Sequence, residues 1–135
     1  MATPKAETVP LRSDADIVRA RQLVRQWAVE LKFGLIDQTK IVTAASELAR
    51  NTVVHAGGGT MQVETLSEGP RQGLRLVFED KGPGIADIAT AMKDGFTTGG
   101  GLGLGLGGAK RLSNEFSVES RVGFGTRIVL ARWRG

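Results

Sequence analysis

The run DGFTTGGGLGLGLGGA, residues 94–109, is the most informative part of this 135-residue chain. The chain has 19 glycines, about twice the ~7% of average usage, and eight of them fall between Gly95 and Gly108. Glycines let successive backbone N–H groups converge on an anion, and a helix expected over residues 106–112 would point its N-terminus at the same place. The run therefore predicts a phosphate cradle. The interleaved leucines at 102, 104 and 106 argue against a plain flexible linker.

Three better-known nucleotide motifs do not fit this run. A P-loop needs Lys and then Ser or Thr directly after its last glycine, whereas Ala109, Lys110 and Arg111 follow here. Gly103-x-Gly105-x-x-Gly108 matches the dinucleotide fingerprint, but no strand precedes it and no acidic residue follows at the spacing that a ribose requires. The motifs that accompany a protein-kinase glycine loop are absent.

Upstream, the sequence Asp80-Lys81-Gly82-Pro83-Gly84-Ile85 directly follows an expected strand, Leu74–Glu79. A carboxylate at the end of a strand can accept a hydrogen bond from an exocyclic amine such as that of adenine. Alone, the pattern is equally typical of an ordinary turn.

Further upstream, a helix is expected over residues 38–56, with Asp37 as its N-cap and three glycines from Gly57 at its end. Glu47, Asn51 and His55 follow one another at a spacing of four residues, so they form one polar stripe. Asn51 offers the hard oxygen that Mg²⁺ prefers, and Glu47 one turn away could act as a general base. The alternative is a solvated helix face.

The remaining pattern predicts an α+β fold: a two-layer sandwich with a mixed sheet and helices on one face. Residues 1–135 are expected to form a single domain, with residues 1–6 as a flexible tail. The capping-box-like Ser13-Asp14-Ala15-Asp16 begins a helix that Gly34 should stop. The expected strands are 7–11, 61–66, 74–79, 116–120 and 126–133, and the further helices are 87–93, a weak one, and 106–112.

Composition excludes several functions. The chain has no cysteine and one histidine, which removes thiol catalysis, cysteine-bound zinc and histidine-cluster metal sites. The net charge of +4 is spread along the chain, aromatic residues are 5% and there is no tyrosine, so nucleic acid is not an expected partner. No apolar run approaches the ~20 residues that span a bilayer, and MATPKAETVP lacks the apolar centre of a signal peptide. We therefore expect no membrane partner and a cytoplasmic location.

Taken in order, the motifs resemble those of the GHKL ATPases, the superfamily of gyrase, Hsp90, histidine kinases and MutL. The order is Glu47-x-x-x-Asn51, then Asp80-x-Gly82-x-Gly84, then the glycine-leucine run, then Gly123-x-Gly125-Thr126. The resemblance covers about residues 40–130. Within the superfamily, residues 46–51 and 94–103 are similar to the anti-sigma-factor-type serine kinases, above all the switch kinases of the stressosome.

The resemblance implies ATP and Mg²⁺ as ligands, with Glu47 as the base, Asn51 as the metal ligand and Asp80 as the adenine anchor. It assigns nucleotide contacts to Asn51, Asp80, Gly82, Gly84, Ile85, Thr98, Gly99, Gly101, Leu102, Gly103, Leu104, Gly105 and Thr126.

The resemblance further implies phosphorylation of a serine on a STAS-domain antagonist protein and activation of a PP2C-type phosphatase. Three alternatives stay open. The first is an anti-sigma factor that acts mainly by binding a sigma factor. The second is an ATP hydrolase that drives a clamp, and the third is a nucleotide binder without catalysis.

Overall fold

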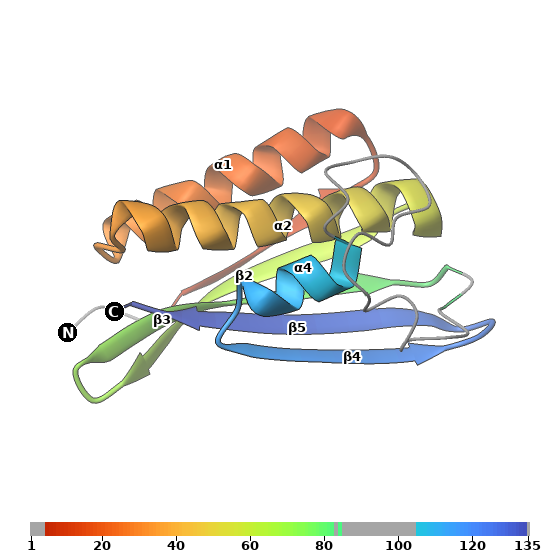
Figure 1. Cartoon of the computed structure of the whole chain (residues 1–135). Coiled ribbons are helices and arrows are strands. Elements are labelled where there is room, and N and C mark those ends of the chain that lie inside the picture. Colours follow the sequence, from red (N-terminus) through yellow and green to blue (C-terminus); the bar gives the residue numbers. More distant parts are fainter. Residues whose placement is uncertain (1–4, 83, 85–104, 135) are drawn as a thin grey trace.

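The structure, a computed structural model, describes residues 5–82, 84 and 105–134 (Figure 1). Five strands form one sheet in the order β1-β2-β3-β5-β4, and three described helices lie on one of its faces. The strands are β1 (Ala6–Leu11), β2 (Gly59–Glu68), β3 (Arg71–Asp80), β4 (Glu115–Arg121) and β5 (Gly125–Trp133). The helices are α1 (Asp14–Glu30), α2 (Leu35–Ala56) and α4 (Gly105–Arg111).

The predicted α+β fold with helices on one face is confirmed, but the expected mixed sheet is wrong. Every pair of neighbouring strands in the described sheet is antiparallel. The reason is connectivity. Tight hairpins join β2 to β3 and β4 to β5, while the α1–α2 pair returns the chain so that β2 runs against β1.

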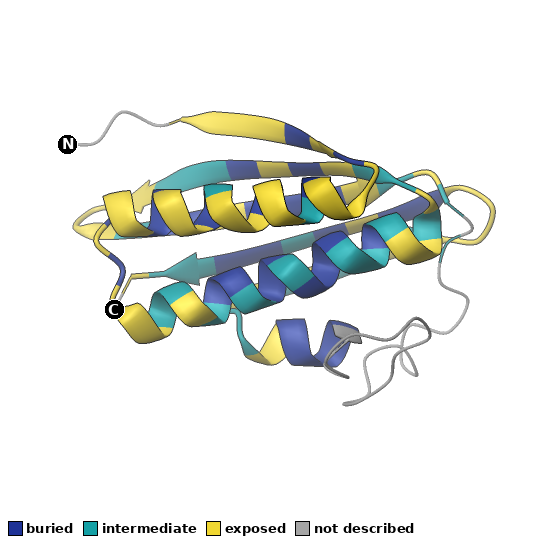
Figure 2. Cartoon of the chain, turned by 90° about the horizontal axis from the view of Figure 1, so that it is seen from above, coloured by how far each residue is buried: buried dark blue, intermediate teal, exposed yellow. Residues whose placement is uncertain are grey.

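The core lies between the sheet and the helices. Along β3, Leu74, Leu76 and Phe78 are at most 1% exposed, as the period of two of a strand with one covered face requires. Trp27 of α1 is 4% exposed and belongs to the same cluster. Seen from above the helix layer, α2 lies between α1 and α4 (Figure 2).

Helix α1 is capped differently from the predicted capping box. Ser13 is its N-cap, but the side chain makes no capping hydrogen bond. Instead, the buried Asp16 carboxylate accepts from the backbone N–H of Arg12 at 2.8 Å and from the Arg19 guanidinium at 3.2 Å. The acidic residue of the box therefore satisfies a backbone donor before the helix, and the serine hydroxyl does not take part.

The corner between α1 and α2 also differs from the prediction, which placed the end of the helix at Gly34. Helix α1 ends at Glu30, and Lys32 adopts a left-handed backbone with φ of 64°. The N–H groups of Lys32 and Phe33 donate to the carbonyl oxygens of Val29 and Ala28, each at 2.9 Å. This is a Schellman cap with lysine where glycine is usual. Burial of Phe33, which is 3% exposed, holds the unusual backbone in place.

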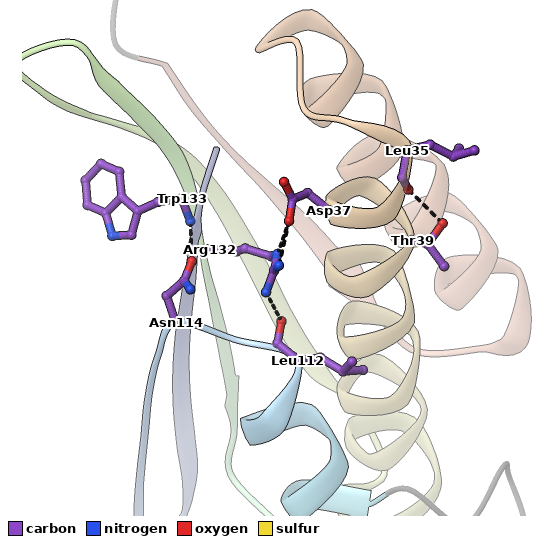
Figure 3. Close-up of polar contacts among 7 residues, drawn as sticks. All are labelled: Leu35, Asp37, Thr39, Leu112, Asn114, Arg132 and Trp133. Atoms are coloured by element: carbon purple, nitrogen blue, oxygen red, sulfur yellow. Dashed lines mark hydrogen bonds and ion pairs between the residues drawn. The ribbon is translucent and has the colours of Figure 1, made fainter. Parts of the chain in front are cut away.

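Asp37 is not the N-cap of α2. Helix α2 begins at Leu35 with Gly34 as its N-cap, so Asp37 lies in the first turn. Its carboxylate accepts from Arg132 of β5 at 3.1 Å (Nε) and 2.5 Å (Nη2), and Arg132 Nη1 donates to the carbonyl oxygen of Leu112 at 3.0 Å (Figure 3). One guanidinium thereby links α2, the end of α4 and the sheet.

At the N-terminus, the expected tail over residues 1–6 is too long. Ala6 belongs to β1, and the backbone N–H of Lys5 donates to the Thr65 hydroxyl at 2.9 Å. The weak helix expected over residues 87–93 lies outside the described residues. Within the described part of the chain, no helix is both long and apolar enough to cross a membrane.

The Arg132–Asp37 contact predicts a measurable loss of stability on substitution. The two side chains are 12% and 17% exposed, so Arg132→Met should lower the free energy of unfolding by about 1.5–3 kcal/mol, the range for hydrogen bonds to charged groups. Urea unfolding followed by circular dichroism measures this. Glu30→Ala is the control, because its ion pair with Lys5 is 46% exposed on both sides and should leave the midpoint nearly unchanged. Equal shifts in the two variants would contradict a structural role for Arg132.

Candidate functional site

The site is organised by a row of four residues across the sheet. Asp80 at the end of β3 pairs with Gly59 of β2 on one side and with Thr126 of β5 on the other, and Thr126 pairs with Ser120 of β4. Residues paired across neighbouring strands point to the same face. Because Asp80 is two residues after the buried Phe78, that face is the one the helices cover.

Two glycines allow the backbones and helix α2 to approach closely enough to form this row. A Cβ added at Gly125 would lie 2.1 Å from the carbonyl oxygen of Asp80, and φ of Gly125 is 126°. A Cβ at Gly59 would lie 2.8 Å from the Thr52 methyl and 3.1 Å from the Cβ of Asp80. Only glycine fits at either position, and the missing side chain at Gly59 lets α2 approach the sheet beside Asp80.

Asp80 itself is held by its own turn. One carboxylate oxygen, Oδ1, accepts from the backbone N–H of Gly82 at 2.9 Å. The side chain makes no other hydrogen bond or ion pair with the described residues. It is half-buried, so the acceptor capacity of Oδ2 remains for a ligand.

The turn after Asp80 is wedged between α2 and the last hairpin. A Cβ at Gly82 would lie 2.8 Å from the Cα of Ala56, at the end of α2. Gly84 has φ of 80°, and a Cβ there would lie 2.5 Å from the carbonyl oxygen of Arg121. The D-x-G-x-G pattern therefore requires its glycines for close packing, which an ordinary exposed turn would not.

Helix α2 contributes the polar stripe predicted from the sequence, but the three members differ in burial. Glu47 is 7% exposed, Asn51 is half-buried and His55 is exposed. Helix α2 lies between α1 and α4 (Figure 2), and Glu47 is one of its buried residues. The alternative of a solvated face is therefore wrong for Glu47. The Glu47 carboxylate makes no hydrogen bond or ion pair with any described side chain or backbone group.

Thr52 connects α2 to the row. It is 4% exposed, and its hydroxyl donates to the carbonyl oxygen of Leu48 at 2.9 Å. Its methyl group lies where a side chain at Gly59 would be. Because Thr52 directly follows Asn51, the same turn of α2 carries both the contact to the sheet and the predicted metal ligand.

A hollow of about 560 Å³ opens at the ends of β3, β4 and β5. Asp80, Ser120 and Thr126 line it from the covered face, and Phe124 and Gly125 line it at the hairpin. It continues past the sheet edge to residues of the other face, Glu79, Glu119 and Arg127. Only the part of the hollow that Asp80, Ser120 and Thr126 line coincides with the row. We therefore define the site by the row and not by the hollow.

The predicted site residues that the structure describes lie on two helices and at the ends of two strands. Glu47 and Asn51 lie on α2; Asp80, Gly82 and Gly84 lie at the end of β3; Thr126 begins β5; and Gly105 is the first residue of α4. The other predicted contacts lie outside the described residues: Ile85, Thr98, Gly99, Gly101, Leu102, Gly103 and Leu104.

Sequence reasoning missed Ser120, Thr52 and the packing role of Gly59. A signal existed for Ser120, because a hairpin turning through residues 122–124 pairs Arg121 with Gly125 and therefore Ser120 with Thr126. No local signal existed for Thr52 and Gly59, since their contact joins a helix to a neighbouring strand.

Comparison of the sequence with known proteins shows the family to which the chain belongs. Residues 36–134 match the family described as "Histidine kinase-, DNA gyrase B-, and HSP90-like ATPase". The chain is 50% identical over 125 residues to the serine/threonine-protein kinase RsbT of Bacillus subtilis, covering 93% of this chain and 94% of RsbT. It is 29% identical over 119 residues to the anti-sigma F factor of Clostridium kluyveri, covering 84% and 82% of the two chains.

Solved structures share the fold. The crystal structure of the RsbU and RsbW domains of Rv1364c from Mycobacterium tuberculosis matches with a TM-score of 0.64 and 21% identity, over 99% of this chain and 34% of that one. The mycobacterial sensor histidine kinase MprB matches with a TM-score of 0.55 and 20% identity, over 96% and 98% of the two chains. From the match over residues 36–134 and the motifs that lie within it, the chain belongs to the histidine kinase-, DNA gyrase B- and HSP90-like ATPase family, the GHKL ATPases.

Proposed function

We propose that this protein is an ATP-dependent serine kinase that phosphorylates a STAS-domain antagonist protein in a partner-switching pathway. The kinase class follows from 50% identity to RsbT over almost the whole chain. The observation that carries the chemistry is the Glu47 carboxylate on α2, one turn before Asn51: the residue is 7% exposed, and its carboxylate has no hydrogen-bond or ion-pair partner among the described residues. Its oxygens are not among the fully buried atoms without a partner, so they keep contact with solvent and remain available to accept a proton.

The adenine base is proposed to lie against Asp80 and Thr126. Oδ1 of Asp80 is occupied by the Gly82 N–H, while Oδ2 is available to accept from the exocyclic amine. The phosphates are assigned to the glycine run, on the contacts proposed from sequence at Thr98, Gly99, Gly101, Leu102, Gly103, Leu104 and Gly105, with Ile85 beside the base. Backbone N–H groups in such a run would gather around the phosphate oxygens.

Asn51 fits the proposed Mg²⁺ site by the chemistry of its donor, a neutral carboxamide oxygen on a rigid helix. Mg²⁺ in nucleotide sites takes few protein ligands and shares its remaining positions with phosphates and water. When bound, the ion would neutralise charge on the phosphate oxygens. Asn51 is half-buried and makes no side-chain hydrogen bond with the described residues, so its oxygen remains available.

Glu47 is proposed as the general base. The serine oxygen of the substrate protein forms a bond to the γ-phosphorus of ATP, the bond from that phosphorus to the bridging oxygen breaks, and ADP leaves. The serine proton passes to the Glu47 carboxylate. Proton removal by a positioned carboxylate is typical of this reaction class.

The second partner is proposed to be a PP2C-type phosphatase that the kinase activates after it leaves its phosphorylated substrate, with all partners in the cytoplasm. The 29% identity to anti-sigma F factors favours one further candidate, a sigma factor held by direct binding. A pull-down with purified sigma factors and phosphatase separates these two candidates.

The kinase proposal is tested by incubating the protein with Mg-ATP and purified STAS-domain proteins and measuring intact masses. One STAS-domain protein should gain the mass of a single phosphoryl group, and a variant with alanine at its modified serine should gain none. ATP consumption without any mass gain would instead support an ATP hydrolase.

Asp80→Asn should weaken ATP binding by about 10- to 100-fold, since an unpaired donor at a buried site costs ~1–3 kcal/mol. The asparagine oxygen can still accept from the Gly82 N–H, so the turn is retained while its amide presents a donor to the adenine amine. GTP should bind poorly to the unmodified protein, because guanine carries an acceptor, a carbonyl oxygen, where adenine carries the amine that donates to Asp80. Isothermal titration calorimetry measures both affinities.

The matched control for Asp80→Asn is Glu79→Gln. Glu79 is the preceding residue, it is exposed on the other face of the sheet, and its contact with Arg127 is 3.8 Å. Its substitution should leave ATP affinity unchanged. An Asp80→Asn protein that binds ATP as tightly as the parent would exclude the adenine-anchor role.

Glu47→Gln should retain Mg-ATP binding and lose phosphoryl transfer by about 10²- to 10⁴-fold, the usual contribution of a general base. Asn51→Ala should instead lower the Mg²⁺-dependent part of nucleotide affinity. Binding is measured by calorimetry with and without Mg²⁺, and transfer by the rate of mass gain in a single turnover. If both variants lost ATP binding equally, Glu47 would act on the metal or on the structure.

A further inference from the structure

Strand β4 forms one edge of the sheet (Figure 1). It pairs with β5 on one side, and the sheet formed by the described residues has no strand on its other side. An edge strand presents unpaired backbone groups on which a further strand can dock. The opposite edge, β1, is interrupted by Pro10, which has no N–H to donate, whereas β4 contains neither proline nor lysine. Of the two edges, β4 is therefore the better suited to accept another strand.

The hairpin shows which residues of β4 direct their backbone groups at the open edge. The carbonyl oxygen of Arg121 accepts from the N–H of Phe124 at 2.9 Å, so it points into the β4–β5 hairpin. Along a strand, the N–H and C=O groups of successive residues point to opposite sides. The backbone groups of Phe116, Val118 and Ser120 therefore point away from β5.

The two ends of β4 carry opposite charges that the chain itself does not pair. Glu115 and Arg121 are exposed on the face of the sheet that the helices leave open, and neither makes an ion pair with any described residue. Oε2 of Glu115 accepts from the indole N–H of Trp133 at 2.8 Å, which leaves Oε1 available. The third charged residue of the strand, Glu119, lies opposite Arg127 of β5 and so already faces a cation.

An antiparallel copy of β4 can pair with this strand only in registers that keep the backbone groups facing each other. Residues directly opposite in such a pair either both direct their groups at the partner strand or both direct them away. The outward set, Phe116, Val118 and Ser120, must therefore lie opposite the same set in the second copy. A shift by half a step opposes outward groups to inward ones and forms no ladder.

Charge selects one of the remaining registers. Centred on Val118, the pairing places Glu115 opposite Arg121 of the second copy, and the two-fold symmetry repeats the contact. Centred on Ser117 it places Glu115 opposite Glu119, and centred on Glu119 it places that residue opposite itself. Like charges directly opposite each other are destabilising. Registers shifted further pair less than half of β4.

We propose that β4 is a docking surface for a second copy of this chain, with the two β4 strands antiparallel and centred on Val118. The interface then contains reciprocal backbone hydrogen bonds between the two Val118 residues and a Glu115–Arg121 ion pair at each end. It also covers further the side chains of Phe116 and Val118, which are half-buried against the core. The row of the candidate site ends at Ser120 on the same strand, so each site lies beside the interface. The docking does not depend on the proposed kinase activity.

The experiment is sedimentation equilibrium of the full chain from micromolar to millimolar concentration, with the parent and with single charge reversals. The parent should pass from monomer to dimer as the concentration rises. In Arg121→Glu, and separately in Glu115→Arg, each ion pair becomes a like-charge contact, so the dissociation constant of the dimer should rise by about 10- to 100-fold. An equimolar mixture of these two variants should form a mixed dimer as tight as that of the parent, because every glutamate then faces an arginine.

Two further variants test the backbone and the register. Val118→Pro removes an N–H that points away from β5, so the β4–β5 ladder is kept while the dimer should be lost. Glu119→Gln is the matched control, because it removes a charge from the same face of β4 that lies opposite Ser117 in this register. It should leave the dissociation constant unchanged. Thermal unfolding of each variant shows whether the fold is retained.

The outcomes distinguish the second copy from other occupants of the edge. A parent that stays monomeric throughout overturns the proposal, and so does a dimer that both charge reversals leave intact. Reversals that weaken the dimer without recovery in the mixture exclude the register centred on Val118 and also overturn it. If the parent is monomeric and Val118→Pro instead abolishes the binding of a purified STAS-domain protein, the edge accepts a strand of that protein and the second copy is the wrong occupant.

Discussion

The backbone contact between Gly125 and Asp80 is the constraint on which the site depends. A Cβ at Gly125 would lie 2.1 Å from the Asp80 carbonyl oxygen, so the start of β5 can pass the end of β3 only without a side chain. That approach sets the register in which Asp80 pairs with Thr126, and the hairpin register then brings Ser120 to Thr126. One glycine thus places a carboxylate and two hydroxyls in a row. Its φ of 126° also makes substitution by any other residue strained.

The helix layer is positioned over this row by contacts at both ends of α2. Near its C-terminus, Thr52 lies over Gly59, and Ala56 contacts Gly82. Near its N-terminus, Asp37 is held by Arg132, which also donates to the end of α4 (Figure 3). Because these contacts come from β2, from the turn after β3 and from β5, α2 can neither slide nor rotate without breaking several of them. Glu47 and Asn51, which lie between the two ends, are therefore held at a fixed height over the sheet.

The described residues divide into a part that suits base recognition and a part that suits phosphoryl transfer. The row offers acceptors and hydroxyls at strand ends, where hydrogen-bond direction can distinguish one base from another. Helix α2 offers a buried carboxylate and a neutral amide oxygen, which suit proton transfer and a hard metal ion. The proposed contribution of the glycine run is its backbone N–H groups. Such a division explains why substitutions in the row should alter nucleotide affinity and preference, whereas Glu47→Gln should alter the rate.

The sequence by itself determined the order of the elements, the family and the identity of Glu47, Asn51, Asp80 and Thr126 as the site residues to be tested. These follow from local spacing, which can be recognised in the sequence without the folded structure: helical periodicity, strand alternation and glycines in fixed motifs. It did not determine the end of α1, because burial of Phe33 supports a left-handed Lys32 that propensity disfavours. It did not determine the start of α2 either, because the carboxylate expected to cap the helix is held by Arg132, 95 residues away in the sequence. Only the tertiary structure decided that Glu47 is buried and that the missing side chain of Gly59 admits Thr52. Both depend on how α2 packs on the sheet, and no local pattern in the sequence records that packing.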